Sequence, residues 1–272
     1  MKERTLLTIF LVLTLTFCTG CYHAYLQSFR STFIGNTSRV HIERGTKKAY
    51  VECGVSYGTG FKPDSVGIAD GNYYDFSTGM QDSTRINQIM RFPAHRANLY
   101  FTYLGNRLVS FQAEGSLSKT GEDVLFRYDI GIGARLYRNH LAGRIFTNIG
   151  LMKTRSDVFV FEKTEYGKYY DLEDSYTATV PFIEMSIAFN DNNPKQIVAP
   201  FYTISFLHAN LFNYHEASVN LNTAYGTVGI FKRIGSFTLS AGMQTEYLFG
   251  SGMTFPHLQF STQLGWIPIV VK

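Results

Sequence analysis

The sequence predicts an all-β protein: an antiparallel, up-and-down transmembrane β-barrel of about ten strands. The first observation is the stretch 123–139, DVLFRYDIGIGARLYRN, in which apolar residues alternate with charged residues and glycines. Successive side chains of a strand point to opposite faces, so this strand has one apolar and one polar face. A strand tilted across a bilayer places about 9–11 residues in the hydrocarbon, with lipid outside and a polar lumen inside. A long strand of a soluble barrel, with its apolar face inward, is the alternative.

Composition provides two further observations. Aromatic residues make up 15% of the 272 residues, with 18 Tyr and 23 Phe, and there are only 7 Pro. This composition favours strands, because aromatic side chains suit a pleated surface. The net charge is +4 and the basic residues are scattered. Since there is no basic tract or stacking motif, we expect no nucleic-acid partner.

The first residues resemble an export signal rather than a structural element. Lys2 and Arg4 precede the apolar run 6–17, which is shorter than the about 20 residues of a spanning helix and suits a signal peptide over 1–20. The run ends at Cys18-Thr19-Gly20-Cys21. This motif resembles the lipobox of bacterial lipoproteins, and the resemblance implies lipidation at Cys21. Cys18 stands where the family has an aliphatic residue, so ordinary cleavage after Gly20 remains the alternative.

Cysteine usage excludes two kinds of site. Cys18 leaves with the signal peptide and lipidation would use Cys21, so only Cys53 remains. One cysteine can form neither an intramolecular disulfide framework nor a cysteine-based zinc site. Cys53 lies on the apolar parity of its strand, where it behaves as a small hydrophobic residue.

We divide the exported chain into a periplasmic tether over 21–45, where no period persists, and a barrel domain over 46–272. The predicted strands cover 47–58, 95–104, 107–118, 123–139, a fifth after Leu141, 176–190, 196–209, 216–231, a ninth after Gly235, and 256–267. A change of phase near Gly226 predicts a β-bulge. The segment 59–94 is a long loop, and the charged, tyrosine-rich segment 153–175 is interpreted as a hairpin extending beyond the membrane.

The loop lengths predict how the barrel sits in the membrane. Connections after the second, fourth, sixth and eighth strands are short, whereas those after the first and fifth are long. Bacterial outer-membrane barrels have an even strand number, short periplasmic turns and longer external loops. The chain resembles this class in architecture, which implies a bacterial outer-membrane location, outer-membrane lipid around the barrel and insertion by the barrel-assembly machinery. The carboxyl-terminal IPIVVK departs from the aromatic ending of the class.

The polar parity of the strands predicts a network of charges in the lumen. Isolated charges are costly at low dielectric, so these side chains should pair with one another or hold water. Ten strands are close to the eight whose interior side chains already fill the barrel, so a wide porin is not expected. The predicted network comprises Glu52, Glu114, Arg127, Asp129, Arg135, Arg144, Glu184 and Glu246.

Short motifs do not predict a catalytic site, a metal site or a cofactor. Residues 54–58, GVSYG, match G-x-S-x-G around Ser56 but are followed by no helix, as a nucleophile elbow requires. Gly131 and Gly133 lack the third glycine of a dinucleotide site and are interpreted as making room in the lumen. His208, His215 and His257 follow no metal-binding spacing, so we interpret them as isolated polar residues.

Three functions are compatible with the sequence. The leading one is a non-enzymatic outer-membrane barrel that acts through its external loops, whose ligand is unknown, or in a structural role. The second is a narrow or gated channel for ions or small solutes. The third is an outer-membrane hydrolase of lipid or peptide that uses Ser56 and a loop histidine.

Overall fold

The structure is a computed structural model. It describes residues 23–35, 39, 41–44, 48–60, 73–75, 80–82, 87–91, 93, 95–105, 109–120, 123–163, 169–193, 196–214, 217–248 and 257–270. The predicted signal peptide and Cys21 lie outside these residues.

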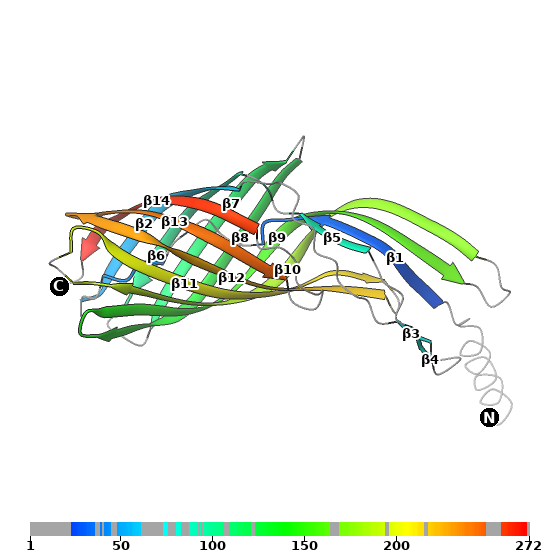
Figure 1. Cartoon of the computed structure of the whole chain (residues 1–272), viewed down its shortest axis with the longest axis horizontal. Helices are drawn as coiled ribbons and strands as arrows, with labels where there is room; N and C mark the ends of the chain where they lie inside the picture. The colour runs from blue at the N-terminus through cyan, green and yellow to red at the C-terminus, as the bar shows by residue number, and fades with distance from the viewer. Residues whose placement is uncertain are drawn as a thin grey trace, which may run out of the picture.

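Ten antiparallel strands close into a barrel, so the predicted fold class is confirmed (Figure 1). Each strand pairs with the next one in the barrel, and the last pairs with the first. No helix among the described residues is long and apolar enough to cross a membrane. The barrel strands are β2 (Tyr50–Gly60), β6 (His95–Leu104), β7 (Ser110–Thr120), β8 (Asp123–Arg138), β9 (Leu141–Lys163), β10 (Tyr169–Asp191), β11 (Ala199–Tyr214), β12 (Ala217–Ile234), β13 (Phe237–Leu248) and β14 (His257–Val270).

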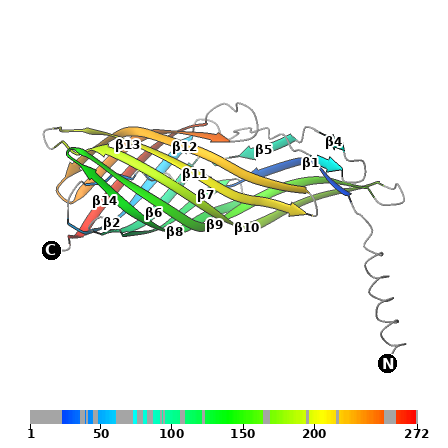
Figure 2. The same cartoon turned by 90° about the horizontal axis from the view of Figure 1, so that it is seen from below.

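The two ends of the barrel differ. The tight turns at 139–140 and 235–236, the connections after β6 and β10, and the last residues of β14 share one end, which we call the turn end. At the opposite end, the extension end, β9 and β10 continue as a paired ribbon beyond the other strands (Figure 2). The pairing expected of the predicted hairpin over 153–175 is confirmed for 153–163 with 169–175, and its position beyond the membrane stays a prediction. Two short strands, β3 (Tyr73–Asp75) and β4 (Met80–Asp82), pair with each other within the long segment after β2.

The amino-terminal segment is not a free linker. Its residues form β1 (His23–Thr32), which pairs antiparallel with β9 from Arg155 to Lys163. A further strand, β5 (Asn87–Arg91), pairs parallel with β1. After β1 the chain enters the barrel, where Phe33 and Ile34 are fully buried. Where the sequence predicts a tether over 21–45, the described residues thus form a strand and a lumen segment, because β9 offers a free edge and the lumen offers ionic partners.

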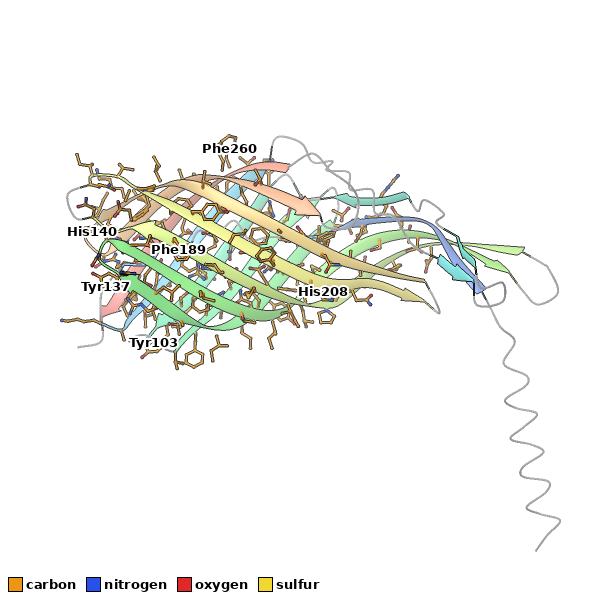
Figure 3. The ribbon with its side chains drawn as sticks, turned by 60° about the horizontal axis from the view of Figure 1, so that its bottom comes forward. Tyr103, Tyr137, His140, Phe189, His208 and Phe260 are labelled. Carbon is orange, nitrogen blue, oxygen red and sulfur yellow. The ribbon has the colours of Figure 1, made fainter. Side chains whose placement is uncertain are left out.

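The outer face of the barrel is apolar. On β8, Val124, Ile130 and Ile132 are 51%, 60% and 56% exposed, whereas Leu125 and Arg127 on the other parity are buried. Stacked aromatic pairs lie on this face near both ends, with Phe237 and Trp266 toward the turn end, and Figure 3 shows Tyr103 and Tyr137 near the same end. An outward apolar band between aromatic girdles is typical of barrels that cross membranes.

Glycines of β8 give space to larger lumen side chains. A Cβ on Gly131 would lie 2.9 Å from Cγ of Asn148, and one on Gly133 would lie 2.6 Å from the ring of Phe146. The interpretation that they make room in the lumen fits these contacts. The bulge predicted near Gly226 is wrong, because β12 pairs with β13 without a register shift; the shift lies instead in β11, between Asn210 and Phe212.

Ile130 tests the outer face. We expect Ile130→Arg to destabilise the folded barrel by about 2–4 kcal/mol in a bilayer, because a charge would face the hydrocarbon near its middle. The folded fraction can be measured by heat-modifiable mobility on a gel. Ile130→Leu is the matched control and should fold like the wild type. Folding of the signal-free chain in buffer without detergent would contradict a lipid-facing exterior.

Candidate functional site in the lumen

The lumen holds a balanced set of buried charges. Among the described residues, five arginines and five carboxylates are less than a tenth exposed, so the formal charges cancel. An unpaired charge in such a site is strongly destabilising, whereas a paired and hydrogen-bonded one is tolerated. The ten residues are Arg39, Glu43, Glu52, Arg96, Glu114, Arg127, Asp129, Arg135, Arg144 and Glu184.

One group of charges surrounds Arg127 near the extension end. Its guanidinium donates to Asp129 Oδ2 from Nε at 3.3 Å and from Nη2 at 3.2 Å, and it also pairs with Glu184. Nη1 donates to the carbonyl of Gly35 at 2.5 Å. The guanidinium carbon lies 4.3 Å from the ring centroid of Phe182. Arg127 therefore joins two barrel strands, β8 and β10, to the amino-terminal segment.

A second group surrounds Glu43, which comes from the amino-terminal segment. Arg135 donates to Oε1 at 2.5 Å, and Arg144 donates to Oε2 at 3.2 Å. The hydroxyl of Tyr50 donates to Oε1 at 3.1 Å. The backbone of Glu43 exchanges two hydrogen bonds with the amide of Asn190, at 2.7 and 2.8 Å. Both carboxylate oxygens and both backbone groups of Glu43 are thus bonded to the barrel wall.

Arg39 forms the third contact of this segment with the wall. Its Nη1 donates to Glu114 at 3.1 Å, and its Nη2 donates to Thr102 at 2.5 Å. The guanidinium carbon lies 4.0 Å from the ring centroid of Tyr100. The side-chain ion pairs of the segment have both polarities, since Arg39 meets a wall carboxylate and Glu43 meets two wall arginines.

The structure places seven of the eight predicted network residues inside the barrel, all of them buried: Glu52, Glu114, Arg127, Asp129, Arg135, Arg144 and Glu184. The backbone of Glu246 lies in β13, but its side chain lies outside the described part of the structure. Arg144 links the second group to Glu52 at 2.7 Å.

Sequence reasoning missed Arg39, Glu43 and Arg96. The first two were assigned to the tether. A signal was present, because Arg39, His41 and Glu43 share one parity with apolar residues between them, which is the alternation of an extended segment with a polar face. Arg96 continues the buried parity of β6.

The serine and histidine candidates are not brought together in the described structure. Ser56 lies within β2 and is buried on the lumen side, with strand rather than helix after it. His95 is exposed, and its Nδ1 lies 2.8 Å from the hydroxyl of Tyr57. His208 is exposed and bonds Asn222 at 2.7 Å. His215 and the side chain of His257 lie outside the described residues.

Metal ligands are not clustered either. Among the described residues, no group of three or more His, Cys, Asp or Glu side chains could hold a metal ion. The described cysteine, Cys53, is a free thiol of intermediate exposure.

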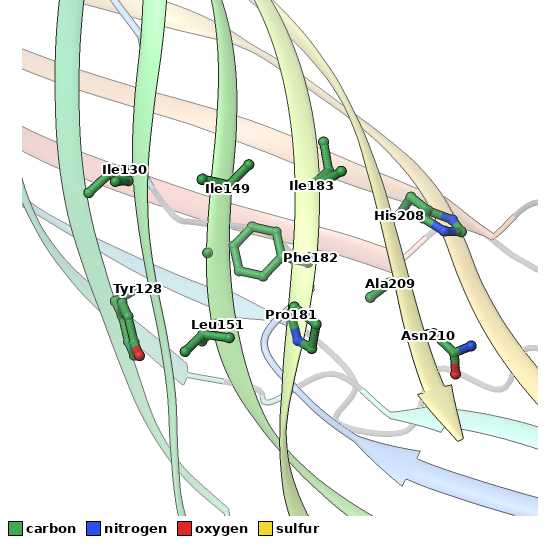
Figure 4. Close-up of a pocket in the computed structure, with 11 residues that line it drawn as sticks. Tyr128, Ile130, Ile149, Leu151, Pro181, Phe182, Ile183, His208, Ala209 and Asn210 are labelled. Atoms are coloured by element: carbon green, nitrogen blue, oxygen red, sulfur yellow. The ribbon is translucent and has the colours of Figure 1, made fainter. Parts of the chain in front are cut away.

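The outer wall carries an apolar groove of about 590 Å³ across β8 to β11. Figure 4 shows Ile130, Ile149 and Ile183 in a row along it, with His208 at one side. The groove lies on the exposed apolar face rather than in the lumen. Its lining suits an aliphatic chain, as expected of a surface in contact with lipid.

No protein-family model and no curated protein matches this chain. Two solved structures resemble its fold. LpxR from Salmonella typhimurium is 8% identical, with a TM-score of 0.36 over 79% of this chain and 99% of its own. The translocator domain of the autotransporter NalP from Neisseria meningitidis is 9% identical, with a TM-score of 0.29 over 81% of this chain and 89% of its own. At these scores neither similarity bears on function, and the fold rests on the strand pairing itself.

Glu43 is the test residue for the lumen network. Glu43→Gln keeps the size of the side chain but removes the charge that Arg135 and Arg144 share, so we expect a loss of about 3–5 kcal/mol in unfolding free energy. Urea titration in detergent, followed by the heat-modifiable band, measures this loss.

The matched control is Asp123→Asn, which breaks the ion pair with Arg155, whose side chain is 54% exposed. An exposed pair contributes about 0–1 kcal/mol, so this variant should resemble the wild type. Equal urea midpoints for Glu43→Gln and the wild type would show that Glu43 does not hold the lumen together.

Proposed function

We propose that this chain is an outer-membrane β-barrel whose lumen is sealed by its own amino-terminal segment and which acts, without enzymatic chemistry, through the sheet at its extension end. The observation that carries the proposal is the burial of residues 33–35, 39 and 41–43 inside the barrel. A lumen filled by polypeptide and by balanced ion pairs offers no continuous aqueous path. We therefore expect the lumen to be blocked to ions and solutes.

The outer-membrane location is supported by physical complementarity. An even number of antiparallel strands closes without an edge, as hydrocarbon requires. On β9 the outward residues up to Leu151 are apolar except Thr147, and Lys153 and Arg155 follow. The apolar part of the strand, 141–151, matches the about 9–11 residues of a tilted span. The partners that we propose are outer-membrane lipid around this band and the barrel-assembly machinery that inserts such barrels.

A role at the extension end follows from the length of β9 and β10. Each strand has 23 residues, about twice what the bilayer needs. The surplus forms a sheet with β1 and β5 beyond the apolar band. The turn end has no comparable surface among the described residues. Because β9 and β10 are extended only at this end, the sheet there is the surface through which we expect the protein to act. Such a role does not require the Ser56 hydroxyl.

Conductance distinguishes a sealed barrel from a channel. In planar bilayers we expect the wild type to give no stable current steps, because the segment blocks the lumen. The double variant Arg39→Ala, Glu43→Ala removes the ion pairs with Glu114, Arg135 and Arg144 and should produce open steps. Heat-modifiable mobility confirms that the variant is folded, and Asp123→Asn serves as the silent control. Steps of defined size from the wild type would favour the channel instead.

A further inference from the structure

The amino-terminal segment contacts the barrel wall at successive positions along β9, from the extension end to the turn end. At the extension end, Ser31 Oγ lies 2.9 Å from Ser156 Oγ of β9. Four residues later, the carbonyl of Gly35 accepts a hydrogen bond from Arg127, which pairs with Met152 of β9. The segment has therefore moved down β9 toward the turn end by the same number of residues.

The descent continues without reversal. Arg39 binds Glu114, which the register across β7 and β8 places level with Gly150 of β9. Glu43 then binds Arg144, further toward the turn end on β9 itself. Twelve residues separate Ser156 from Arg144, and twelve separate Ser31 from Glu43. Twelve residues of β9 span about 40 Å at about 3.3 Å per residue, and twelve residues of the segment cover that distance only when the segment is close to fully extended.

The segment leaves the barrel at the turn end. The Arg44 guanidinium donates to the carbonyl of Ser236 at 2.8 Å and to that of Gly235 at 3.3 Å, in the β12–β13 turn. From there the chain enters β2, whose Tyr50 pairs with Val270 at the end of β14. The segment thus crosses the whole barrel once. The first barrel strand, β2, then begins at the turn end, and the last one, β14, finishes there.

We propose that the amino-terminal segment carries the mature amino terminus through the barrel to the external surface, where β1 becomes part of a displayed sheet. This proposal rests on the proposed function, because it takes the turn end as periplasmic. His23 pairs with Lys163, the last residue of β9, eight residues beyond Arg155. His23 therefore lies about 26 Å along β9 from Arg155.

The same geometry determines the side on which a lipid would lie. Cys21 is two residues before His23, so at most about 7 Å of chain separates them. A diacyl lipid on Cys21, as the lipobox resemblance implies, would therefore be tied by a short length of chain to the position of His23. A tether that anchors the barrel from the periplasmic leaflet would require β1 to leave β9 and the segment to leave the lumen. If Cys21 is lipidated, this proposal displays the lipid at the external surface.

Disulfide trapping tests the path of the segment in cell membranes. The variant Ser31→Cys, Ser156→Cys, in a Cys53→Ala background, places two thiols where the hydroxyls are 2.9 Å apart, and facing cross-strand positions allow a disulfide. We expect oxidation to shift its gel mobility, with reversal by reductant. The control Ser31→Cys, Ser186→Cys pairs the same residue with a buried lumen serine that lies level with Phe146. It should give no crosslink.

Thiol labelling then tests the side of the membrane. Arg30→Cys and Ser236→Cys place single exposed thiols at the extension end and the turn end, again with Cys53→Ala. A membrane-impermeant maleimide, read at each introduced cysteine by peptide mass spectrometry, should label Arg30→Cys in intact cells. Ser236→Cys should be labelled only after permeabilisation.

The outcomes separate this inference from the proposed function. A folded barrel that is silent in bilayers but lacks the Ser31–Ser156 crosslink would keep the sealed lumen and overturn the threaded path. Labelling of Ser236→Cys but not of Arg30→Cys in intact cells would overturn display of the amino terminus. A wild type that conducts while the crosslink forms would overturn the sealed barrel alone.

Discussion

The burial of ten charges inside a closed barrel is the constraint on which the rest of this structure depends. Each charge must find a partner, because an orphaned ion at low dielectric is far more destabilising than an exposed one. The wall alone holds four arginines and four carboxylates among the described residues, and the amino-terminal segment adds one of each, Arg39 and Glu43. Glu43 satisfies two wall arginines at once. The segment is therefore an integral part of the lumen.

The extended sheet follows from the same arrangement. A segment that runs through the barrel must have its earlier residues beyond one end, and exposed backbone there needs hydrogen-bonding partners. β9 and β10 continue past the apolar band, and β9 provides the edge with which β1 pairs over 155–163. The lengths of these strands, the position of β1 and the filling of the lumen are thus three consequences of one path of the chain.

The sequence predicted the barrel wall well because the wall obeys a local rule. Alternation with a period of two places Ile130 outward and Asp129 inward whatever the partners are. The second predicted strand, 95–104, has the bounds of β6, and the inward parity identified seven buried charges. The rule weakens beyond Leu151, where polar residues occur on both parities of β9, and the continuous strands there were interpreted only as a hairpin.

The sequence by itself determined which residues of the wall point outward and which point into the lumen, since a strand assigns faces residue by residue. Only the tertiary structure decided which charges pair and where the amino-terminal segment lies. Arg135 and Glu43 are 92 residues apart, Asn190 and Glu43 are 147 residues apart, and Arg44 meets Ser236 across 192 residues. A local pattern carries no information about contacts at such separations. Closure of the barrel brings them together, because it encloses the amino-terminal segment among strands that are far apart in the sequence.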